Sequence, residues 1–326
     1  MTKLGQFCQR ICILLVSIFL SILFSELFLN LINYNYTPLR IKLLNKNDWR
    51  YYHSFDDKHF IYDPYLVWRP KNNYSVFNSQ GYRGKELAIK KRKDEFRIFA
   101  IGDSNTLGWD EKDGPNWPLY LDELLNKTDQ RYIVVNAGVY GYTSFQGLRR
   151  FKEILPFQPD MVLISFGSND AHMVTVSDDE FNRRTIRKIN LDILLHKFKT
   201  GQLVIEFFDK ILLKKIFPLV HRVNLNEYRN NLNEIIRISK TKGIKIVLLT
   251  RPYIGESPDR FYWKNFGLDY NAATIKVAKD NSVPVIDVYS YFRNKEEYFI
   301  DECHFSKAGH DEAAKLIYEK IKIYLN

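Results

Sequence analysis

Cysteine is scarce in this chain, with only three among 326 residues. Cys8 and Cys12 lie in an apolar stretch near the N-terminus, so Cys303 stands alone in the C-terminal two thirds. A disulfide within that part is therefore excluded, and cysteine usage identifies no redox compartment. Internal repeats and low-complexity tracts are also missing, which argues against a repeat architecture.

Several motifs with a known chemistry are missing as well. There is neither a Gly-rich dinucleotide turn nor a phosphate loop, so we expect no cofactor. His53 and His59 bracket Asp56 and Asp57, but no histidine pair with helical metal-ligand spacing follows. A solvated loop is the preferred interpretation, and no metal is predicted. The pattern Gly-x-Ser-x-Gly is also lacking, which argues against the α/β-hydrolase fold.

The net charge of +10 would suit nucleic acid or a membrane surface. The basic residues concentrate at 40–50, 90–93 and 183–188, and no nucleic-acid-binding motif accompanies them. We therefore expect no nucleic-acid partner, and prefer a solvated face or contact with lipid head groups.

Residues 11–32 form an almost continuous apolar run, which is long enough to span a bilayer. Lys3 and Arg10 give residues 1–10 the character of a basic n-region. Because no small-x-small cleavage site and no lipid-attachment cysteine follow, an uncleaved signal anchor is preferred over a removed signal peptide. The alternative is a buried amphipathic helix, and Glu26 is its best support.

The orientation of such an anchor is open to two interpretations. A short basic start before an apolar run is typical of export, which would place the rest of the chain outside the cytoplasm, in the periplasm or at the cell surface. The positive-inside rule favours the reverse, because four basic residues follow the run: Arg40, Lys42, Lys46 and Arg50. We favour export.

Four short segments follow in the remaining chain: residues 102–106, 136–138, 167–170 and 301–304. Each lies at the end of an apolar run or opens a helical pattern. Because the carboxyl ends of parallel strands meet at one edge of a sheet, we expect all four segments to converge there.

The chemistry of these segments is that of acyl transfer. Ser104 follows the buried-strand pattern of residues 97–101, and Gly102 allows a sharp turn there. A serine hydroxyl needs a general base within hydrogen-bond reach, for which His304 is the candidate. Asp301 lies three residues before His304 and can fix its tautomer and stabilise the imidazolium.

Hydrogen-bond donors for a developing oxyanion are also predicted. Gly138 follows the apolar run 132–135, and its backbone N–H could approach substrate closely. Asn169 follows the run 161–166, where its side-chain amide could donate. With the backbone N–H of Ser104, these groups would form an oxyanion hole of three donors.

Together, in this order, the four segments resemble the blocks of the SGNH (GDSL-like) hydrolase superfamily, over about residues 96–326. Asn105 stands where the name-giving motif has Leu. The resemblance implies the following roles: Ser104 as nucleophile and first oxyanion donor, Gly138 and Asn169 as further donors, His304 as base and Asp301 as its partner.

Other interpretations remain for single residues. Gly138 and Asn169 alone would be a turn glycine and an Asx-turn asparagine, and Ser104 and Asp301 alone would be helix caps. Cys303 could be proposed as a nucleophile, but we interpret it as a small packed spacer. The joint pattern favours the catalytic interpretation.

Alternating apolar runs and helical patterns predict an α/β fold for residues 96–326, a three-layer α/β/α sandwich with a central parallel sheet, SGNH- or flavodoxin-like and preceded by the transmembrane helix. The helices are expected at 117–126, 144–155, 226–240, 270–279 and 307–324, and the strands at 97–101, 132–135, 161–166, 244–249 and 283–288.

Two segments stand outside this alternation. Residues 33–95 are expected to form a lead-in that covers the site, in which Trp68 and Tyr82 either line a sugar-binding rim or are buried in an irregular cover. Residues 171–223 are expected to be a helical insertion. Its amphipathic stretch 203–217 could be a lid or a membrane-surface helix, and a cap packed on the core is preferred.

The sequence thus predicts a membrane-anchored serine esterase that hydrolyses an acyl ester of a cell-envelope carbohydrate, with acetyl as a candidate acyl group, through an acyl-serine intermediate. One alternative is an O-acyltransferase of the same fold that modifies an envelope polysaccharide. Another is a non-catalytic envelope-binding protein. The sequence indicates no oligomeric state.

Overall fold

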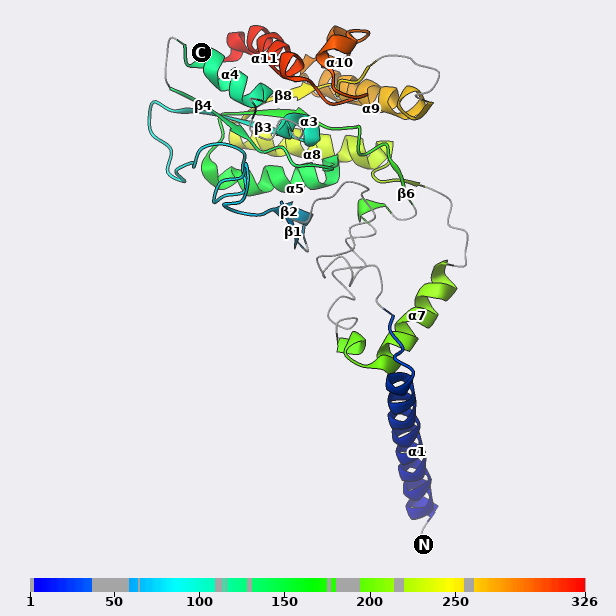
Figure 1. The fold of residues 1–326 in the computed structure, drawn as a ribbon. Helices are drawn as coiled ribbons and strands as arrows, with labels where there is room; N and C mark the ends of the chain where they lie inside the picture. Colours follow the sequence, from blue (N-terminus) through cyan, green and yellow to red (C-terminus); the bar gives the residue numbers. More distant parts are fainter. Residues whose placement is uncertain are drawn as a thin grey trace. The chain divides into compact units, whose positions relative to one another are not determined.

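The structure of the protein is a computed structural model that forms two compact units, one of residues 1–57 and 183–218, the other of residues 58–182 and 219–326 (Figure 1). The described residues are 3–36, 59–63, 65–108, 114, 116–127, 131–174, 177–179, 194–213, 220–254 and 261–325. His53, the basic residues at 40–50 and 183–188, and much of the expected insertion 171–223 lie outside the described residues.

The second unit is built on a parallel sheet of five strands in the order β4-β3-β5-β8-β9. These are β3 (Phe96–Gly102), β4 (Tyr132–Asn136), β5 (Met161–Ser165), β8 (Lys245–Leu249) and β9 (Val285–Ile286). The chain runs from β3 outward to β4, then returns across β3 to β5, so its direction reverses between β3 and β5. In open α/β sheets, ligands bind at such a switch point, outside the carboxyl ends of the strands.

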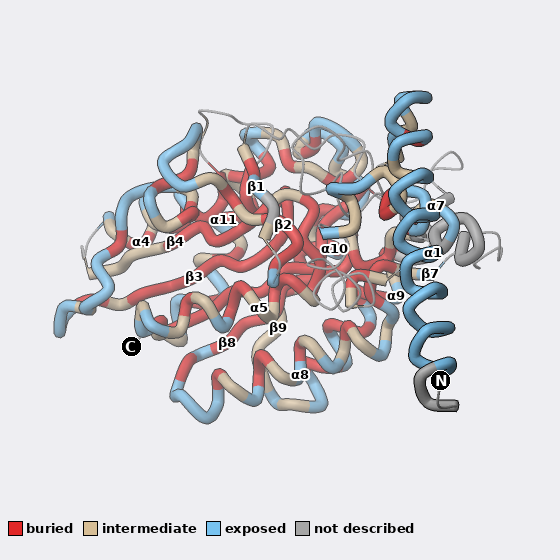
Figure 2. The backbone as a smooth tube through the Cα atoms, turned by 90° about the horizontal axis from the view of Figure 1, so that it is seen from below, coloured by how far each residue is buried: buried red, intermediate tan, exposed pale blue. Residues whose placement is uncertain are grey.

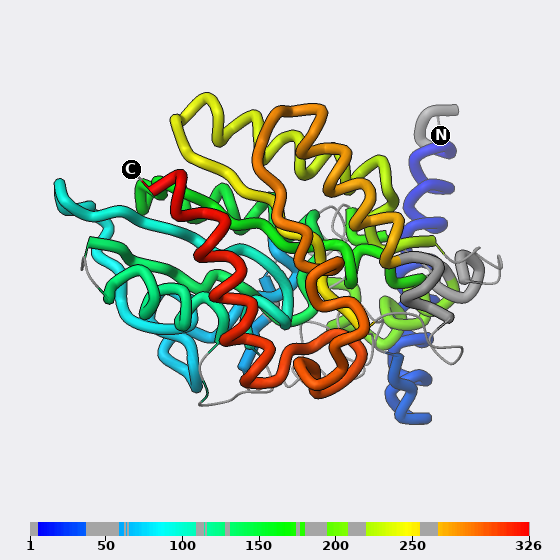
Figure 3. The backbone as a smooth tube through the Cα atoms, turned by 90° about the horizontal axis from the view of Figure 1, so that it is seen from above, coloured from blue at the N-terminus to red at the C-terminus, as the bar shows by residue number. Residues whose placement is uncertain are grey.

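Helices cover both faces of this sheet. On one face, α4 (Trp117–Leu125) packs against α11 (Lys307–Ile321), and on the other, α8 (Leu225–Lys242) lies between α5 (Ser144–Ile154) and α9 (Phe261–Asp280). Figure 3 shows α11 in red beside α4. The predicted three-layer α/β/α fold is confirmed.

The core lies between the sheet and these two helical layers, and the central strands β3, β5 and β8 are largely buried on both faces (Figure 2). Along β3, Ile98 and Ala100 pack in the cluster that includes α4 and α11, while Phe99 and Ile101, which alternate with them, are buried as well. This explains why the strands are continuous apolar runs, as parallel strands covered on both sides are.

Short elements complete the second unit. They are the antiparallel pairs β1 (Phe60–Asp63) with β2 (Val67–Pro70) and β6 (Met173–Val174) with β7 (Val220–His221), the helices α3 (Ser104–Leu107) and α10 (Val288–Phe292), and the 3-10 turns η1 (Leu155–Phe157), η2 (Glu296–Tyr298) and η3 (Lys322–Tyr324).

In the described part of the lead-in before β3, Trp68 and Tyr82 are buried side chains. Trp68 in β2 is 0% exposed, and its indole N–H donates to the Tyr140 carbonyl over 3.0 Å. Tyr82 is 3% exposed and packs edge-on against Phe99. The interpretation of these two side chains as a sugar-binding rim is therefore wrong, because burial leaves no ring face for a ligand.

The first unit contains α1 (Lys3–Leu31) and α7 (Lys199–Leu213). Residues Gln6–Leu31 of α1 are long and apolar enough to cross a membrane, and nearly all of them are exposed, with Leu29 the buried exception. The helix begins at Lys3, so the expected basic n-region is itself largely helical. Helix α7 covers much of the amphipathic stretch predicted at 203–217.

Candidate active site

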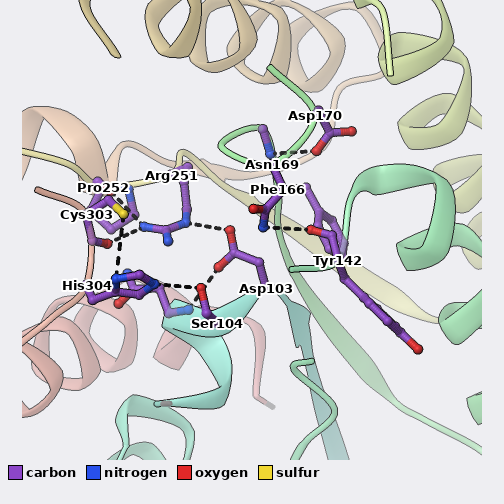
Figure 4. Close-up of polar contacts among 12 residues, drawn as sticks. Asp103, Ser104, Tyr142, Phe166, Asn169, Asp170, Arg251, Pro252, Cys303 and His304 are labelled. Atoms are coloured by element: carbon purple, nitrogen blue, oxygen red, sulfur yellow. Dashed lines mark hydrogen bonds and ion pairs between the residues drawn. The ribbon is translucent and has the colours of Figure 1, made fainter. Parts of the chain in front are cut away.

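Ser104 is the first residue of α3, directly after β3 (Figure 4). Asp103 caps this short helix by accepting from the Asn105 N–H over 3.0 Å. A Cβ at Gly102 would lie 2.2 Å from Thr106 Oγ1 and 2.8 Å from the Ser165 carbonyl oxygen, so only glycine allows the turn. The turn places the Ser104 hydroxyl at the carboxyl edge of the sheet.

His304 reaches Ser104 from the loop before α11. Its Nε2 lies 2.7 Å from Ser104 Oγ, and its Nδ1 lies 2.6 Å from Asp301 Oδ2. Asp301 is held in turn, because its Oδ1 accepts from the backbone N–H groups of Cys303, over 2.8 Å, and His304, over 2.7 Å. The structure thus joins the three residues predicted as a triad in one chain of hydrogen bonds.

The electrostatics of this chain favour a charged imidazolium. Burial lowers the pKa of His304, but contact with the Cys303 sulfur and the hydrogen bond with Asp301 outweigh burial and raise that pKa above its ordinary value. Burial raises the pKa of Asp301, yet its hydrogen bonds hold this pKa well below the usual range. The bond with the His304 ring has the largest lowering effect. These contacts stabilise the imidazolium that forms during the reaction. In the neutral ring, the carboxylate keeps the hydrogen on Nδ1 and leaves Nε2 free to accept the serine proton.

A buried ion pair links the loop of His304 to the turn of Ser104. Arg251, just past β8, donates from Nε to Asp103 Oδ2 over 2.8 Å and from Nη1 to the Cys303 carbonyl over 2.7 Å. Both charged side chains are buried, so removing either would leave the other uncompensated at a cost of about 3–5 kcal/mol. The sequence analysis missed Arg251 because nothing in the local pattern after β8 marks it.

Asn169 lies in the turn after β5, facing the carboxyl edge. Its Nδ2 donates to the Tyr142 carbonyl over 3.1 Å, which uses one amide hydrogen and fixes the nitrogen end of the side chain. Asp170 holds the turn by accepting from the Gly167 N–H over 3.1 Å and from the Ser144 hydroxyl over 2.6 Å. Burial raises the pKa of Asp170 to about 7, although the bonds from Ser144 oppose that shift.

Gly138 is placed differently from what the sequence suggests. Its N–H already donates to Asn136 Oδ1 over 3.0 Å, so it is not a bare donor in this structure. Asn136 is itself fixed, because its amide nitrogen donates to the Thr106 carbonyl over 2.9 Å and to Asn116 Oδ1 over 2.9 Å. A Cβ at Gly138 would lie 2.5 Å from the Leu107 nitrogen, so glycine is required for close packing on α3.

Gly141, three residues after Gly138, has a backbone N–H that the sequence-based prediction of donors did not include. It has a left-handed φ of 72°, and among the described residues its N–H makes no hydrogen bond. The next residue, Tyr142, supplies the carbonyl that orients Asn169. The available signal was the second glycine in the spacing Gly138-x-x-Gly141.

Cys303 and His310 both have structural partners. Cys303 is buried with its sulfur 3.7 Å from His304 Nδ1, and His310 is buried in α11 with its Nδ1 accepting from the Trp117 N–H over 3.3 Å. In the described part of the chain, one group has metal-ligand composition, with Asp301, Cys303 and His304 offering atoms within 4.8 Å of one another. A cation there would have to break the bond between Asp301 and His304.

Comparisons with known proteins agree with this geometry. A sequence model of the GDSL-like Lipase/Acylhydrolase family matches residues 100–312. The uncharacterized lipoprotein YqeF of Bacillus subtilis is 24% identical over 254 residues, which cover 69% of this chain and 87% of that protein. An arylesterase of Vibrio mimicus is 33% identical over 75 residues, which are 23% of this chain and 38% of the arylesterase.

Among solved structures, the lipase/acylhydrolase from Enterococcus faecalis superposes with a TM-score of 0.50 and 25% identity, over 71% of this chain and 97% of that one. The family match spans more than half of the chain and contains Ser104, Asn169 and His304. This chain therefore belongs to the GDSL-like lipase/acylhydrolase family and is a serine ester hydrolase.

Proposed function

We propose that the protein cleaves its ester through an acyl-enzyme on Ser104, with His304 as general base and Asp301 as its partner. The observation that carries this proposal is the continuous chain from Ser104 Oγ to His304 Nε2, 2.7 Å, and from His304 Nδ1 to Asp301 Oδ2, 2.6 Å. The first distance is within reach for proton transfer from the serine to its base, and the second is that of a hydrogen bond which orients the base.

The reaction proceeds in two halves. Ser104 Oγ attacks the ester carbonyl carbon as its proton passes to His304 Nε2, and the carbonyl oxygen becomes an oxyanion. When the carbon–oxygen bond of the alcohol breaks, His304 returns the proton to the leaving oxygen. Water then gives a proton to His304 and attacks the acyl carbon. When the bond between that carbon and Ser104 Oγ breaks, His304 returns the proton to Oγ, which releases the acid and restores Ser104.

The oxyanion is proposed to bind the Ser104 N–H and the second amide hydrogen of Asn169. Ser104 is the first residue of α3, where an N–H has no partner inside the helix. The third donor comes from the turn after β4. Gly138 was predicted for it but would have to give up its bond to Asn136, so we assign this role to Gly141.

The substrate is proposed to be an acyl ester, with acetyl as the first candidate, on a carbohydrate of the cell envelope. Helix α1 supports an anchor at the membrane, where such polymers are accessible. The basic start of α1 supports export of the remaining chain, which a reporter active only outside the cytoplasm, fused after Asn326, would test.

Hydrolysis and acyl transfer to a sugar use the same triad, so only the fate of the acyl group separates them. The full chain in detergent, given an activated acetyl ester with and without oligosaccharide acceptors, is expected to yield mainly free acid in both cases. Mass spectrometry that finds mostly acetylated sugar would identify an acyltransferase instead. No turnover with any ester would favour a non-catalytic binding protein.

The pH dependence of activity tests the partnership of His304 and Asp301. His304 must be neutral to accept the Ser104 proton, so a raised pKa makes activity fall as the pH drops through that value. Asp301→Asn removes the charge that stabilises the imidazolium. We expect the acid limb of kcat/KM to move to lower pH, and kcat to fall by roughly a hundred to ten thousandfold.

Asp311→Asn is the matched control, because this carboxylate pairs with Lys315 at the surface of α11. It should leave the pH profile in place. An acid limb that stays at the same pH in Asp301→Asn would show that Asp301 does not set the protonation of His304.

A further inference from the structure

Glu26 in α1 caps the N-terminus of α7. Its Oε1 accepts from the Lys199 N–H over 2.8 Å, and its Oε2 accepts from the Thr200 N–H and hydroxyl, each over 2.8 Å. The first N–H groups of a helix lack partners within the helix and carry partial positive charge, so they suit a carboxylate. This contact explains why an acidic residue, Glu26, lies within the apolar run of residues 11–32.

Further contacts hold α7 along the end of α1. The Tyr34 hydroxyl bonds to Glu206, and the Tyr36 N–H donates to Gln202 Oε1 over 3.0 Å. A Cβ at Gly201 would lie 1.9 Å from the Leu195 carbonyl oxygen, so the preceding turn also packs tightly on the first turn of α7. These bonds make the two helices one unit.

The side of α7 that turns away from these polar contacts is apolar. Gln202 and Ile205 are buried, but Leu203 is 43% exposed, Val204 is 45% exposed and Phe207 is 60% exposed. An amphipathic helix with an exposed apolar side suits a membrane surface, where that side enters the lipid. The helix α1, to which α7 is bonded, also exposes large apolar side chains along almost its whole length.

We propose that α7 is a second membrane element, an interfacial helix that Glu26 docks onto the end of α1 and whose Leu203, Val204 and Phe207 side enters the lipid. The inference rests on the proposed anchoring by α1, because α7 is bonded to residues 26–36 and so shares the depth of the end of that span. Its lipid-facing side would lie at the boundary between head groups and acyl chains, as interfacial helices do.

Spin labelling of the full chain in lipid nanodiscs tests the depth of α7. A nitroxide at Val204→Cys is compared with one at Leu20→Cys in the middle of α1 and one at Lys276→Cys, which is exposed on α9. Cys8 and Cys12 are replaced by serine, and the same protein without an added cysteine measures any labelling of the buried Cys303. Collision rates with oxygen and with a water-soluble nickel chelate report the depth of each label.

We expect the nickel-to-oxygen ratio at residue 204 to lie severalfold below that at residue 276 and above that at residue 20. A ratio equal to that at residue 276 would place α7 in water and overturn the inference. Poor access to both reagents would overturn it too, because the face would then pack on protein, such as a second copy of the chain. A ratio at residue 20 equal to that in water would refute the anchor and α7 with it, while ester hydrolysis on the same sample tests the chemistry separately.

Glu26→Ala tests the docking itself. Without the carboxylate, the first turn of α7 loses its cap, and the label at residue 204 should become more mobile. Ser21→Ala is the matched control, since that hydroxyl bonds only to the Ser17 carbonyl of its own helix. Equal mobility in Glu26→Ala and Ser21→Ala would show that Glu26 does not hold α7.

Discussion

Ser104→Ala is expected to lower ester turnover by about a thousandfold or more and to abolish labelling by a fluorophosphonate probe. The alanine removes the only atom that attacks the ester in our account, while the oxyanion donors and His304 remain. Turnover is measured with an activated acetyl ester, and labelling is read from the protein band. Since Ser104 is buried in a tight turn, circular dichroism must show that the variant is folded.

Ser290→Ala provides the control for this loss. Its hydroxyl donates to Oδ2 of Asp287, the N-cap residue of α10, over 2.6 Å at a solvent-facing position. This variant should be labelled and should turn over substrate like the unmodified protein. Equal labelling of Ser104→Ala and Ser290→Ala would mean that the probe reacts at another residue and that Ser104 is not the nucleophile.

Asn169→Ala is expected to lower kcat by roughly a hundred to a thousandfold with little change in KM. The Tyr142 carbonyl fixes the amide, so its second hydrogen can be held ready for the oxyanion, and this bond strengthens only as charge develops. Steady-state kinetics on the full chain measure both constants. Asn230→Ala, on the exposed side of α8, is the control.

A change confined to KM would mean that Asn169 holds substrate without stabilising the transition state. An unchanged kcat would remove it from the oxyanion hole altogether. After either outcome, the oxyanion hole would consist only of the backbone N–H donors at Ser104 and in the turn after β4.

The convergence of the four segments follows from elementary sheet geometry. Each segment comes after a strand pattern or opens a helix, and parallel strands bring their carboxyl ends to one edge. For Ser104, His304 and Asp301 the spacing was sufficient, because a carboxylate three residues before a histidine can reach its ring. Their distances could not be predicted, since Arg251 and Asp103 join the two loops through a contact between residues 148 positions apart.

The sequence did not show which backbone N–H groups are bonded to nearby side chains. Nothing near Gly138 indicates that Asn136 would turn back to accept its N–H. Trp68 and Tyr82 have the composition of a ligand rim, yet packing beneath the cover buries both, because large aromatic side chains gain most from burial.

The predicted ends of helices and strands were wrong where a helix cap was not recognised. The predicted strand 283–288 shrinks to β9, Val285–Ile286, because Asp287 accepts from the Ser290 N–H and starts α10. Helix α9 begins at Phe261 and not at residue 270, since an aromatic-rich start carries little helical signal. The contact between α1 and α7 could not be predicted, because Glu26 and Lys199 lie 173 residues apart in the sequence.

Trapping the acyl-enzyme tests the central claim most directly. The full chain is mixed with an activated acetyl ester, quenched in acid within the first turnover, digested and examined by mass spectrometry. Our account predicts one acetyl group on the peptide that contains Ser104. In His304→Ala this acetylated peptide should form slowly, and in Ser104→Ala it should not form at all. An acetyl group on Cys303, or turnover without any acylated peptide, would contradict an acyl-serine mechanism.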